Sequence, residues 1–131
     1  MNLVLDTHFV IWLILDPSRL KSWEQAVLSS GEWQPVLSAA SILEMRIKWE
    51  KRNRQGVRKG ELDPTAAIAF AVENDIALAA LSVADCAATL IAPIPHKDPF
   101  DQMLLIHTQQ LGARLLTRDG TLRRHPLALQ P

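Results

Sequence analysis

The sequence has almost no cysteine and no excess of charge of either sign. Cys86 is the single cysteine among 131 residues, which excludes an intramolecular disulfide framework and a zinc site built from several thiolates. We expect Cys86 to be a small core residue in a reducing compartment such as the cytoplasm. Because 14 Lys and Arg balance 14 Asp and Glu, the net charge alone indicates no polyanionic or cationic partner.

Long hydrophobic runs are missing as well. Residues 3–15 are mostly apolar, but they include Asp6 and His8 and follow no basic stretch, so they do not look like a secretion signal. Residues 76–94 are interrupted by Asp85 and contain Pro93, so they offer no uninterrupted stretch of the roughly 20 uncharged residues that cross a bilayer. We therefore expect neither secretion nor a membrane span.

The balanced charge conceals one strongly basic segment. Half of the bases fall within residues 46–59, a window that holds a single acid, Glu50. Outside this window seven bases face thirteen acids, so an acidic body carries the basic segment. The seven bases of the segment are Arg46, Lys48, Lys51, Arg52, Arg54, Arg58 and Lys59.

Short apolar strands alternate with helices along the whole chain. The alternation predicts an α/β fold, with a mostly parallel, about five-stranded sheet covered by helices on both faces, a three-layer α/β/α sandwich in a single domain of residues 1–131. Strands are expected at residues 2–5, 36–38, 76–81, 113–116 and, at one edge, 127–129. Helices are expected to end near residue 15, to span 20–28 and 82–90, and to begin at Ser41, Asp63 and Asp98, with Gly56 and Gly60 as exits of the one from Ser41.

Acidic residues follow the ends of the predicted strands. Asp6 comes directly after the first strand and Asp119 directly after the fourth, at the sheet edge where α/β proteins place their chemistry. An Asp at such a turn is more often a helix cap than a ligand, but Asp6 has apolar residues on its N-terminal side, where a buried carboxylate is costly without a cation or strong donors.

Three further acids are expected at the same edge. Glu44 lies in the first turn of the helix after the second strand, where Ser41 and Glu44 also form a possible capping box. Asp98 and Asp101 begin a later helix, and capping explains one of them better than both. Because carboxylates gathered in this way repel one another, we predict a site for Mg²⁺ or Mn²⁺, which prefer oxygen ligands and can activate water at a phosphate.

Four segments of the chain together carry a family resemblance. They are Leu-Val-Leu-Asp-Thr-His at 3–8, Ser-Ile-Leu-Glu at 41–44, Pro-His-Lys-Asp-Pro-Phe-Asp at 95–101 and Leu-Leu-Thr-Arg-Asp at 115–119. In this order the chain resembles PIN-domain proteins and, more narrowly, the VapC-type ribonuclease toxins of bacterial type II toxin–antitoxin systems. The resemblance runs over residues 2–124, and the segment at 95–101 is its most specific part. It implies a parallel α/β/α sandwich, cleavage of RNA with Mg²⁺ or Mn²⁺, a homodimer, and neutralisation by a cognate antitoxin.

The resemblance also assigns roles to individual residues. Carried over by position, the acidic quartet that holds the metal and carries the catalysis consists of Asp6, Glu44, Asp101 and Asp119, and Asp98 is a neighbour that could share the third role. Thr7 and Thr117 are interpreted as donors that orient these ligands. The chain departs from the family pattern at Lys97 and Gln102, where Arg is common, and the change at Gln102 puts a substrate contact in doubt but not metal binding.

The basic segment needs a role of its own because an acidic metal cluster repels RNA. As the only concentrated source of positive charge, it is predicted to hold the RNA backbone near the site, with Trp49 as a weaker candidate for base stacking. Two alternatives remain open, namely a solvated helix face with Trp49 in the core, and a docking surface for an acidic antitoxin tail.

Two other enzyme classes with an Asp after the first strand do not fit these residues. A dehalogenase-like phosphatase needs a second Asp two residues after Asp6, where this chain has His8, and a receiver domain needs a lysine at a late strand end, where it has Thr117. The remaining alternative is a catalytically inactive PIN-like binding module. The four histidines have no zinc-ligand spacing and are interpreted as structural; they are His8, His96, His107 and His125.

Overall fold

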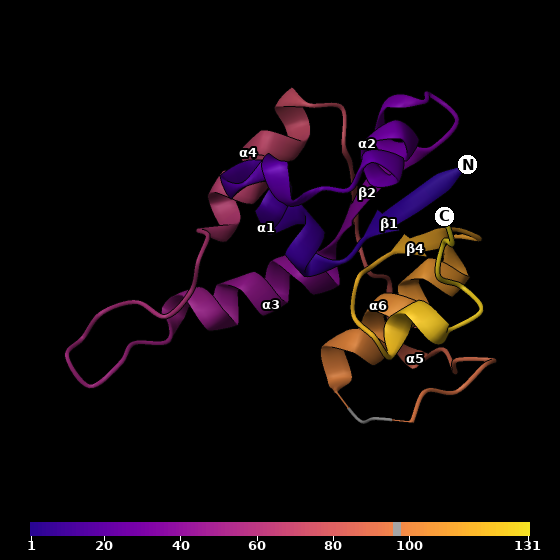
Figure 1. Cartoon of the computed structure of the whole chain (residues 1–131). Helices are drawn as coiled ribbons and strands as arrows, with labels where there is room; N and C mark the ends of the chain where they lie inside the picture. Colours follow the sequence, from indigo (N-terminus) through magenta and orange to yellow (C-terminus); the bar gives the residue numbers. More distant parts are fainter. Residues whose placement is uncertain (96–97) are drawn as a thin grey trace.

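Parallel strands form the sheet at the centre of the molecule (Figure 1). In the computed structural model, which describes residues 1–95 and 98–131, the sheet has four strands in the order β3-β2-β1-β4. Val4 in the central strand β1 lies opposite Val36 on one side and Leu115 on the other. The strands are β1 (Asn2–Leu5), β2 (Gln34–Ser38), β3 (Ala77–Ala79) and β4 (Arg114–Leu116).

Helices cover both faces of this sheet. Leu3 and Leu5 of β1 pack into one core with Phe9 and Met45, whereas Val4 points to the opposite core with Leu104. The predicted three-layer sandwich is therefore confirmed. The helices are α1 (Thr7–Leu15), α2 (Ser22–Ser29), α3 (Ala39–Glu50), α4 (Pro64–Glu73), α5 (Val83–Ala87) and α6 (Pro99–Gln110), with short 3₁₀ turns at Pro17–Arg19 and Leu122–Arg124.

The expected fifth strand at residues 127–129 is wrong. In the described part of the chain this segment makes a single parallel bridge, between Ala128 and Leu115. The amide of Leu115 donates to the carbonyl of Leu127, and the amide of Leu129 donates to the carbonyl of Leu115. The amide of Leu127, however, donates to Nδ1 of His125 at 3.1 Å instead of to β4, so the pairing does not extend into a strand.

The helix expected from Ser82 to residue 90 is shorter than predicted, and it ends at Ala87. Beyond this end the backbone bonds to the side chain of Gln109 in α6 instead of continuing the helix. Gln109 donates to the carbonyl of Thr89 and accepts from the amide of Ile91. On this short surface helix Cys86 is exposed, so its expected place in the core is wrong.

The segment after α3 forms a hairpin that carries much of the positive charge. We call residues 51–59 the basic hairpin; Arg52 bridges Arg58 across it, and Gly56 takes a φ of 79° at its turn. Figure 1 shows it projecting beyond the end of α3. Since α3 ends at Glu50, Gly56 and Gly60 are not its exits as expected.

Gly60 instead brings the returning chain directly onto α3. A Cβ at Gly60 would lie 2.5 Å from the Cα of Trp49, so any side chain there would force the two segments apart. This contact places residues 60–62 against the C-terminal half of α3.

No helix in the described residues is long and apolar enough to cross a membrane.

Candidate active site

The first part of the site joins the start of α1 to the first turns of α3. Thr7 follows β1, and its Oγ1 lies 2.8 Å from Oε1 of Glu44 and 3.0 Å from Oγ of Ser41. Thr7 and Ser41 are buried, whereas Glu44 keeps partial access to solvent. The Thr7 hydroxyl thus fixes one oxygen of the Glu44 carboxylate at the end of the central strand.

The second part joins β1 to the turn after β4. Oγ1 of Thr117 donates to Oδ2 of Asp6 at 2.7 Å and accepts from the amide of Asp119 at 3.0 Å. The strands that carry Asp6 and Thr117 are hydrogen-bonded neighbours, and the amide of Asp6 donates to the carbonyl of Leu116. The sheet register therefore holds Asp6 beside Thr117, with only 6% of Asp6 exposed.

The environment of Asp6 disfavours the charged form of its carboxyl group. Burial raises its pKa above the ordinary value of 3.8, and the negative charge of Glu44 raises it further. The hydrogen bond from Thr117, the charge of His8 and the Thr7 amide lower the pKa, but they do not cancel the effect of burial. A cation beside Asp6 and Glu44 would offset both unfavourable contributions.

The Glu44 carboxylate already has one counter-charge. Nζ of Lys48 lies 2.9 Å from its second oxygen, Oε2, one helical turn further along α3. Sequence reasoning missed this pair, although the spacing of four residues on a helix signals it. Lys48 therefore balances part of the negative charge of Glu44.

The helix cap predicted at Ser41 is wrong. The helix α3 begins two residues earlier, and Oγ of Ser38 accepts the amide of Ala40 as its N-cap. Strand β2 runs to Ser38, so α3 follows the sheet without a loop. Ser41 and Glu44 are thus inside the helix, and their side chains serve the contacts with Thr7 rather than a capping box.

Two of the other three acids, Asp119 and Asp98, accept backbone amides. Oδ1 of Asp119 accepts the amides of Thr121 and Leu122, and only its backbone amide reaches Thr117. Oδ1 of Asp98 caps α6 by accepting the amides of Phe100 and Asp101, which places Asp101 in the first turn of that helix.

The structure therefore brings together Asp6 and Glu44 and joins Asp119 to them through its backbone. Within residues 1–95 and 98–131, no three His, Cys, Asp or Glu side chains form a group that could hold one metal ion. The quartet with Asp101 and Asp119, and the role of Asp98, remain predictions. His96 and Lys97 of the same motif lie outside the described residues.

The donors around Asp6 and Glu44 suit a hard divalent cation. They are carboxylate oxygens with threonine hydroxyls behind them, at Thr7 and Thr117, although Oε2 of Glu44 also pairs with Nζ of Lys48. The raised pKa of Asp6 is the imbalance that such a cation would correct. The residue types present thus fit Mg²⁺ or Mn²⁺, and Asp6 and Glu44 are the residues that would hold such an ion.

An ion pair behind the site anchors the turn after β4. The guanidinium of Arg118 binds both carboxylate oxygens of Glu24, which is fully buried in α2, and also donates to the carbonyl of Arg19. It stacks over the rings of Phe9 and Trp12 at 5.6 and 4.8 Å. Sequence reasoning missed this contact because nothing in the helical pattern marks Glu24 as buried.

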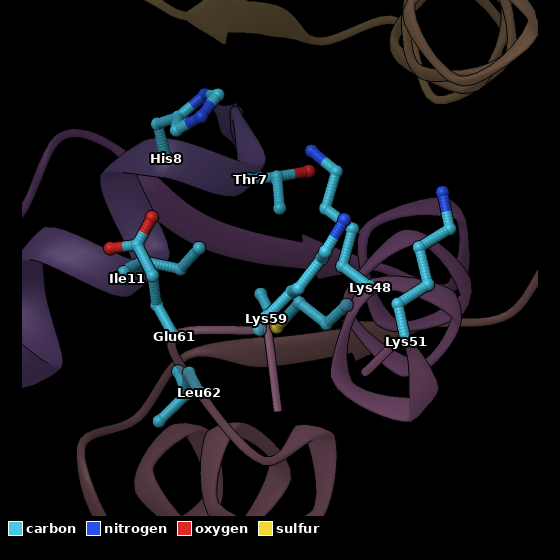
Figure 2. A pocket seen from close by; sticks show the side chains of 10 residues that line it. Thr7, His8, Ile11, Lys48, Lys51, Lys59, Glu61 and Leu62 are labelled. Atoms are coloured by element: carbon cyan, nitrogen blue, oxygen red, sulfur yellow. The ribbon is translucent and has the colours of Figure 1, made fainter. Parts of the chain in front are cut away.

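A cavity of about 290 Å³ opens beside the site. Two of its lining residues, Thr7 and Lys48, also contact Glu44. Figure 2 shows Glu61 on one side of the cavity and the lysines on the other. The lining residues are Thr7, His8, Ile11, Met45, Lys48, Lys51, Lys59, Gly60, Glu61 and Leu62.

The basic segment divides into lysines at the cavity and arginines directed elsewhere. Arg46 pairs with Glu50, Arg52 donates to the carbonyl of Gly56, and Arg58 donates to the carbonyl of Trp49. Arg54 lies exposed in the basic hairpin. The three lysines, Lys48, Lys51 and Lys59, all line the cavity.

Trp49 is partly buried rather than presented to solvent. The guanidinium of Arg58 lies 4.8 Å from the centre of its ring, which occupies one of its faces. Among the described residues Trp49 belongs to neither core, so the alternative that placed it in the core is not supported, and base stacking remains a prediction. The role of the segment in RNA or antitoxin binding remains a prediction.

Two histidines have the structural environment that was predicted for them. His107 is fully buried with Nδ1 2.6 Å from Oγ of Ser38, and Nε2 of His125 lies 2.6 Å from the carbonyl of Ala92. His107 thereby supports the residue that caps α3. His8 instead lines the cavity, and His96 is outside the described residues.

Comparison with known proteins identifies the fold. The model of the PIN domain family matches residues 3–126. The chain is similar to one in the crystal structure of VapBC2 from Rickettsia felis bound to a DNA fragment from their promoter, with a TM-score of 0.62 and 12% sequence identity. This similarity covers 98% of the present chain and 96% of that chain. No curated protein sequence matches significantly.

Proposed function

The chain belongs to the PIN-domain family, and from this premise we propose that it is a VapC-like endoribonuclease that uses Mg²⁺ or Mn²⁺ to hydrolyse RNA. The observation that carries the proposal is the pairing of Asp6 with Glu44. Asp6 is buried with a raised pKa beside a second carboxylate, and two threonine hydroxyls hold both groups in place. Placing two carboxylates together in a buried region is costly unless a cation compensates their charge.

The residues divide into ligands and groups that position them. Asp6 and Glu44 hold the ion, and Asp101 and Asp119 complete its surroundings. Since Asp98 already caps α6 with Oδ1, Asp101 is the better third ligand of the two. When bound, the ion activates a water molecule and stabilises the charge that develops on the scissile phosphate.

The remaining side chains orient these carboxylates. Thr7 holds Oε1 of Glu44, and Thr117 holds Oδ2 of Asp6. The second oxygen of Glu44 contacts a different partner, Lys48. The hydroxyls therefore set the direction from which the two carboxylates approach an ion.

Partners follow from the same family assignment. We propose that RNA is the substrate and that the bases of residues 46–59 draw its backbone to the site. A cognate antitoxin neutralises the enzyme, and the active form of the enzyme is a homodimer. Enzyme and antitoxin act in the cytoplasm. The likeness in fold to a chain of the VapBC2 complex supports the antitoxin as a partner.

One observation favours a second candidate, the catalytically inactive PIN-like binding module. Lys48 occupies the side of Glu44 that an ion would use, and the described residues contain no group of three acids or histidines around one point. Under this candidate Lys48 is a permanent replacement for the cation, and the chain acts through RNA or protein contacts alone.

Cleavage of an RNA panel by purified protein separates the two candidates. We expect cleavage with Mg²⁺ or Mn²⁺ and none with a chelator, and Asp6→Asn should abolish it. Asp75→Asn is the matched control, because it removes one carboxylate from an exposed turn. RNA binding without cleavage by the unaltered chain would instead support the inactive module.

A further inference from the structure

The cavity beside the site has two chemically different sides. Ile11, Met45 and Leu62 supply buried apolar surface, with at most 9% of any of them exposed. Its ionic groups lie at the rim, where Figure 2 shows the three lysines across from Glu61. Its volume of about 290 Å³ lies at the lower limit of small-ligand sites, which begin near ~300 Å³. The cavity therefore suits one small ligand that has an apolar part and an anionic part.

Two of the lysines are placed together by the basic hairpin. The amide of Lys59 donates to the carbonyl of Lys51 at 2.9 Å, so the two residues sit side by side at its base. Lys48 is engaged with Glu44, but in the described part of the chain the ammonium groups of Lys51 and Lys59 form no ion pair. Two lysines on neighbouring backbone segments, both at the cavity and neither in an ion pair in the described residues, favour an anion there, and phosphate is the anion that RNA offers.

The cavity and the candidate active site share a wall. Thr7 lines the cavity and also holds Glu44, and Lys48 does the same from α3. Thr7 and Lys48 therefore connect a ligand seated in the cavity to the Glu44 carboxylate, and Thr7 directly follows Asp6 in the chain.

We propose that this cavity binds one unstacked nucleotide of a single-stranded RNA, adjacent to the bond that is cleaved. Its base lies on the apolar side formed by Ile11, Met45 and Leu62, and its phosphate lies between Lys51 and Lys59. Proteins commonly recognise single-stranded RNA through bases turned out of the stack, which bury a flat face and leave the phosphate to basic side chains. This inference rests on the proposed function, and it assigns a site to the substrate.

The lining residues favour a nucleotide over an acidic peptide. A peptide carboxylate would find Lys51 and Lys59, but an acidic side chain has no flat apolar group to cover the apolar side and no donor for Glu61. A base covers the apolar side, and its amino or imino groups can donate to the Glu61 carboxylate. We therefore take the peptide as an outcome of the test rather than as the ligand.

Titration with small ligands in the presence of a chelator tests the site without any metal or turnover. The probes are the four nucleoside 5′-monophosphates, ribose 5-phosphate and inorganic phosphate, followed by NMR chemical shifts of the full chain. We expect at least one nucleotide to bind roughly tenfold more tightly than ribose 5-phosphate, because only the nucleotide covers the apolar side. The shifts should centre on residues 7–11 and 59–62.

A variant with Lys51→Gln and Lys59→Gln should weaken nucleotide binding by roughly tenfold. Its matched control carries Lys21→Gln and Arg124→Gln, which remove the same charge at exposed positions outside the cavity and outside residues 46–59, and should leave binding nearly unchanged. Equal losses in both variants would reduce the site to general electrostatic attraction and overturn the proposal.

Other results would overturn it too. Equal binding of ribose 5-phosphate and nucleotides would show an anion site without base recognition. Binding of a polyglutamate peptide but of no nucleotide would show a protein-docking site. RNA cleavage without nucleotide binding would contradict this inference alone, whereas nucleotide binding without cleavage would contradict the proposed function and leave the nucleotide site standing.

Discussion

Lys48 is the residue on which the two candidate functions differ most. Its ammonium lies 2.9 Å from Oε2 of Glu44, but its side chain remains 52% exposed. Ion pairs with that much access to solvent contribute about 1 kcal/mol or less. The pair can therefore open, and a divalent cation can replace Lys48 at Glu44.

Replacing Lys48 by Met tests this exchange directly. We expect Lys48→Met to bind Mn²⁺ up to about fivefold more tightly, because a competing charge is lost while the apolar stem is kept. Calorimetric titration of the folded protein measures the affinity, and Lys51→Met is the control that removes the same charge farther along the chain. Weaker binding by Lys48→Met would show that Lys48 does not compete with the metal.

Asp6 gives a pH dependence with a defined sign. Because its pKa is raised in the folded state, the folded chain binds the Asp6 proton more tightly than the unfolded chain does. Stability from this group is thus present at low pH and is lost as pH rises from 3.8 through the raised value. At neutral pH the ionised Asp6 destabilises the metal-free protein.

Asp6→Asn should therefore stabilise the protein in a chelator at pH 7, by on the order of 1 kcal/mol, as is common when a functional site is relieved of charge. The gain should shrink as the pH is lowered, because Asp6 then becomes neutral in the parent protein as well. Thermal melts of both proteins across pH measure it. A gain that stays constant or grows at low pH would contradict the assignment of the raised pKa to Asp6.

Among the connections between elements, the ion pair of Arg118 with Glu24 links the turn after β4 to α2. Burial alone would raise the pKa of Glu24, but hydrogen bonds from Arg118 and the Lys21 amide, with the charge of Arg118, lower it overall. We expect Arg118→Met to destabilise the fold by roughly 3–5 kcal/mol, because a buried carboxylate loses its partner. Denaturant unfolding measures this loss.

The control for that prediction is a double variant. Glu24→Gln combined with Arg118→Met removes both charges, so it should recover much of the stability lost in Arg118→Met. No recovery would mean that Arg118 acts mainly by packing on Phe9 and Trp12.

The contact of Gly60 with α3 fixes the position of the cavity wall. A Cβ at Gly60 would overlap the backbone at Trp49, which cannot move aside as a side chain can. Gly60→Ala should therefore cost about 1–3 kcal/mol of stability, measured by the melting temperature. Gly120→Ala, where a Cβ meets no atom within 4 Å, should be nearly neutral, and equal losses in the two would contradict this account.

Elements with a local signal were predictable from the sequence. The Asp-Pro pairs at Asp63 and Asp98 start helices as predicted, because cap and proline act within a few residues. The start of α3 was misplaced since Ser38 and Ser41 are equally good caps in isolation, and packing decides between them. The end of α5 depends on Gln109 in α6, a distant partner that no local pattern reveals.

The candidate site was predictable to a similar extent. Strand order brought Asp6 and Thr117 together, and the helix after β2 brought Glu44 to Thr7, as positions after parallel strands predict. The cavity was not predictable, because it depends on Gly60 folding the chain back onto α3. The partners of the arginines likewise depend on the shape of the basic hairpin.

In the molecule as a whole, net neutrality results from two regions of opposite charge. The carboxylates of Asp6 and Glu44 lie at the end of β1, and the lysines of α3 and the basic hairpin line one side of the adjacent cavity. This arrangement places the proposed cation site beside the proposed site for RNA. Such a neighbourhood is what a metal-dependent nuclease requires, and a neutral total charge does not argue against it.

The central claim is that Asp6 and its neighbours cleave RNA, and the most direct measurement maps new RNA ends in cells. The chain and its Asp6→Asn variant would be induced at equal levels and the 5′ ends in total RNA sequenced. We predict a small set of new ends that appear with the unaltered chain and are absent with Asp6→Asn, while Asp75→Asn still produces them. The same ends with Asp6→Asn, or no new ends with the unaltered chain, would contradict the account.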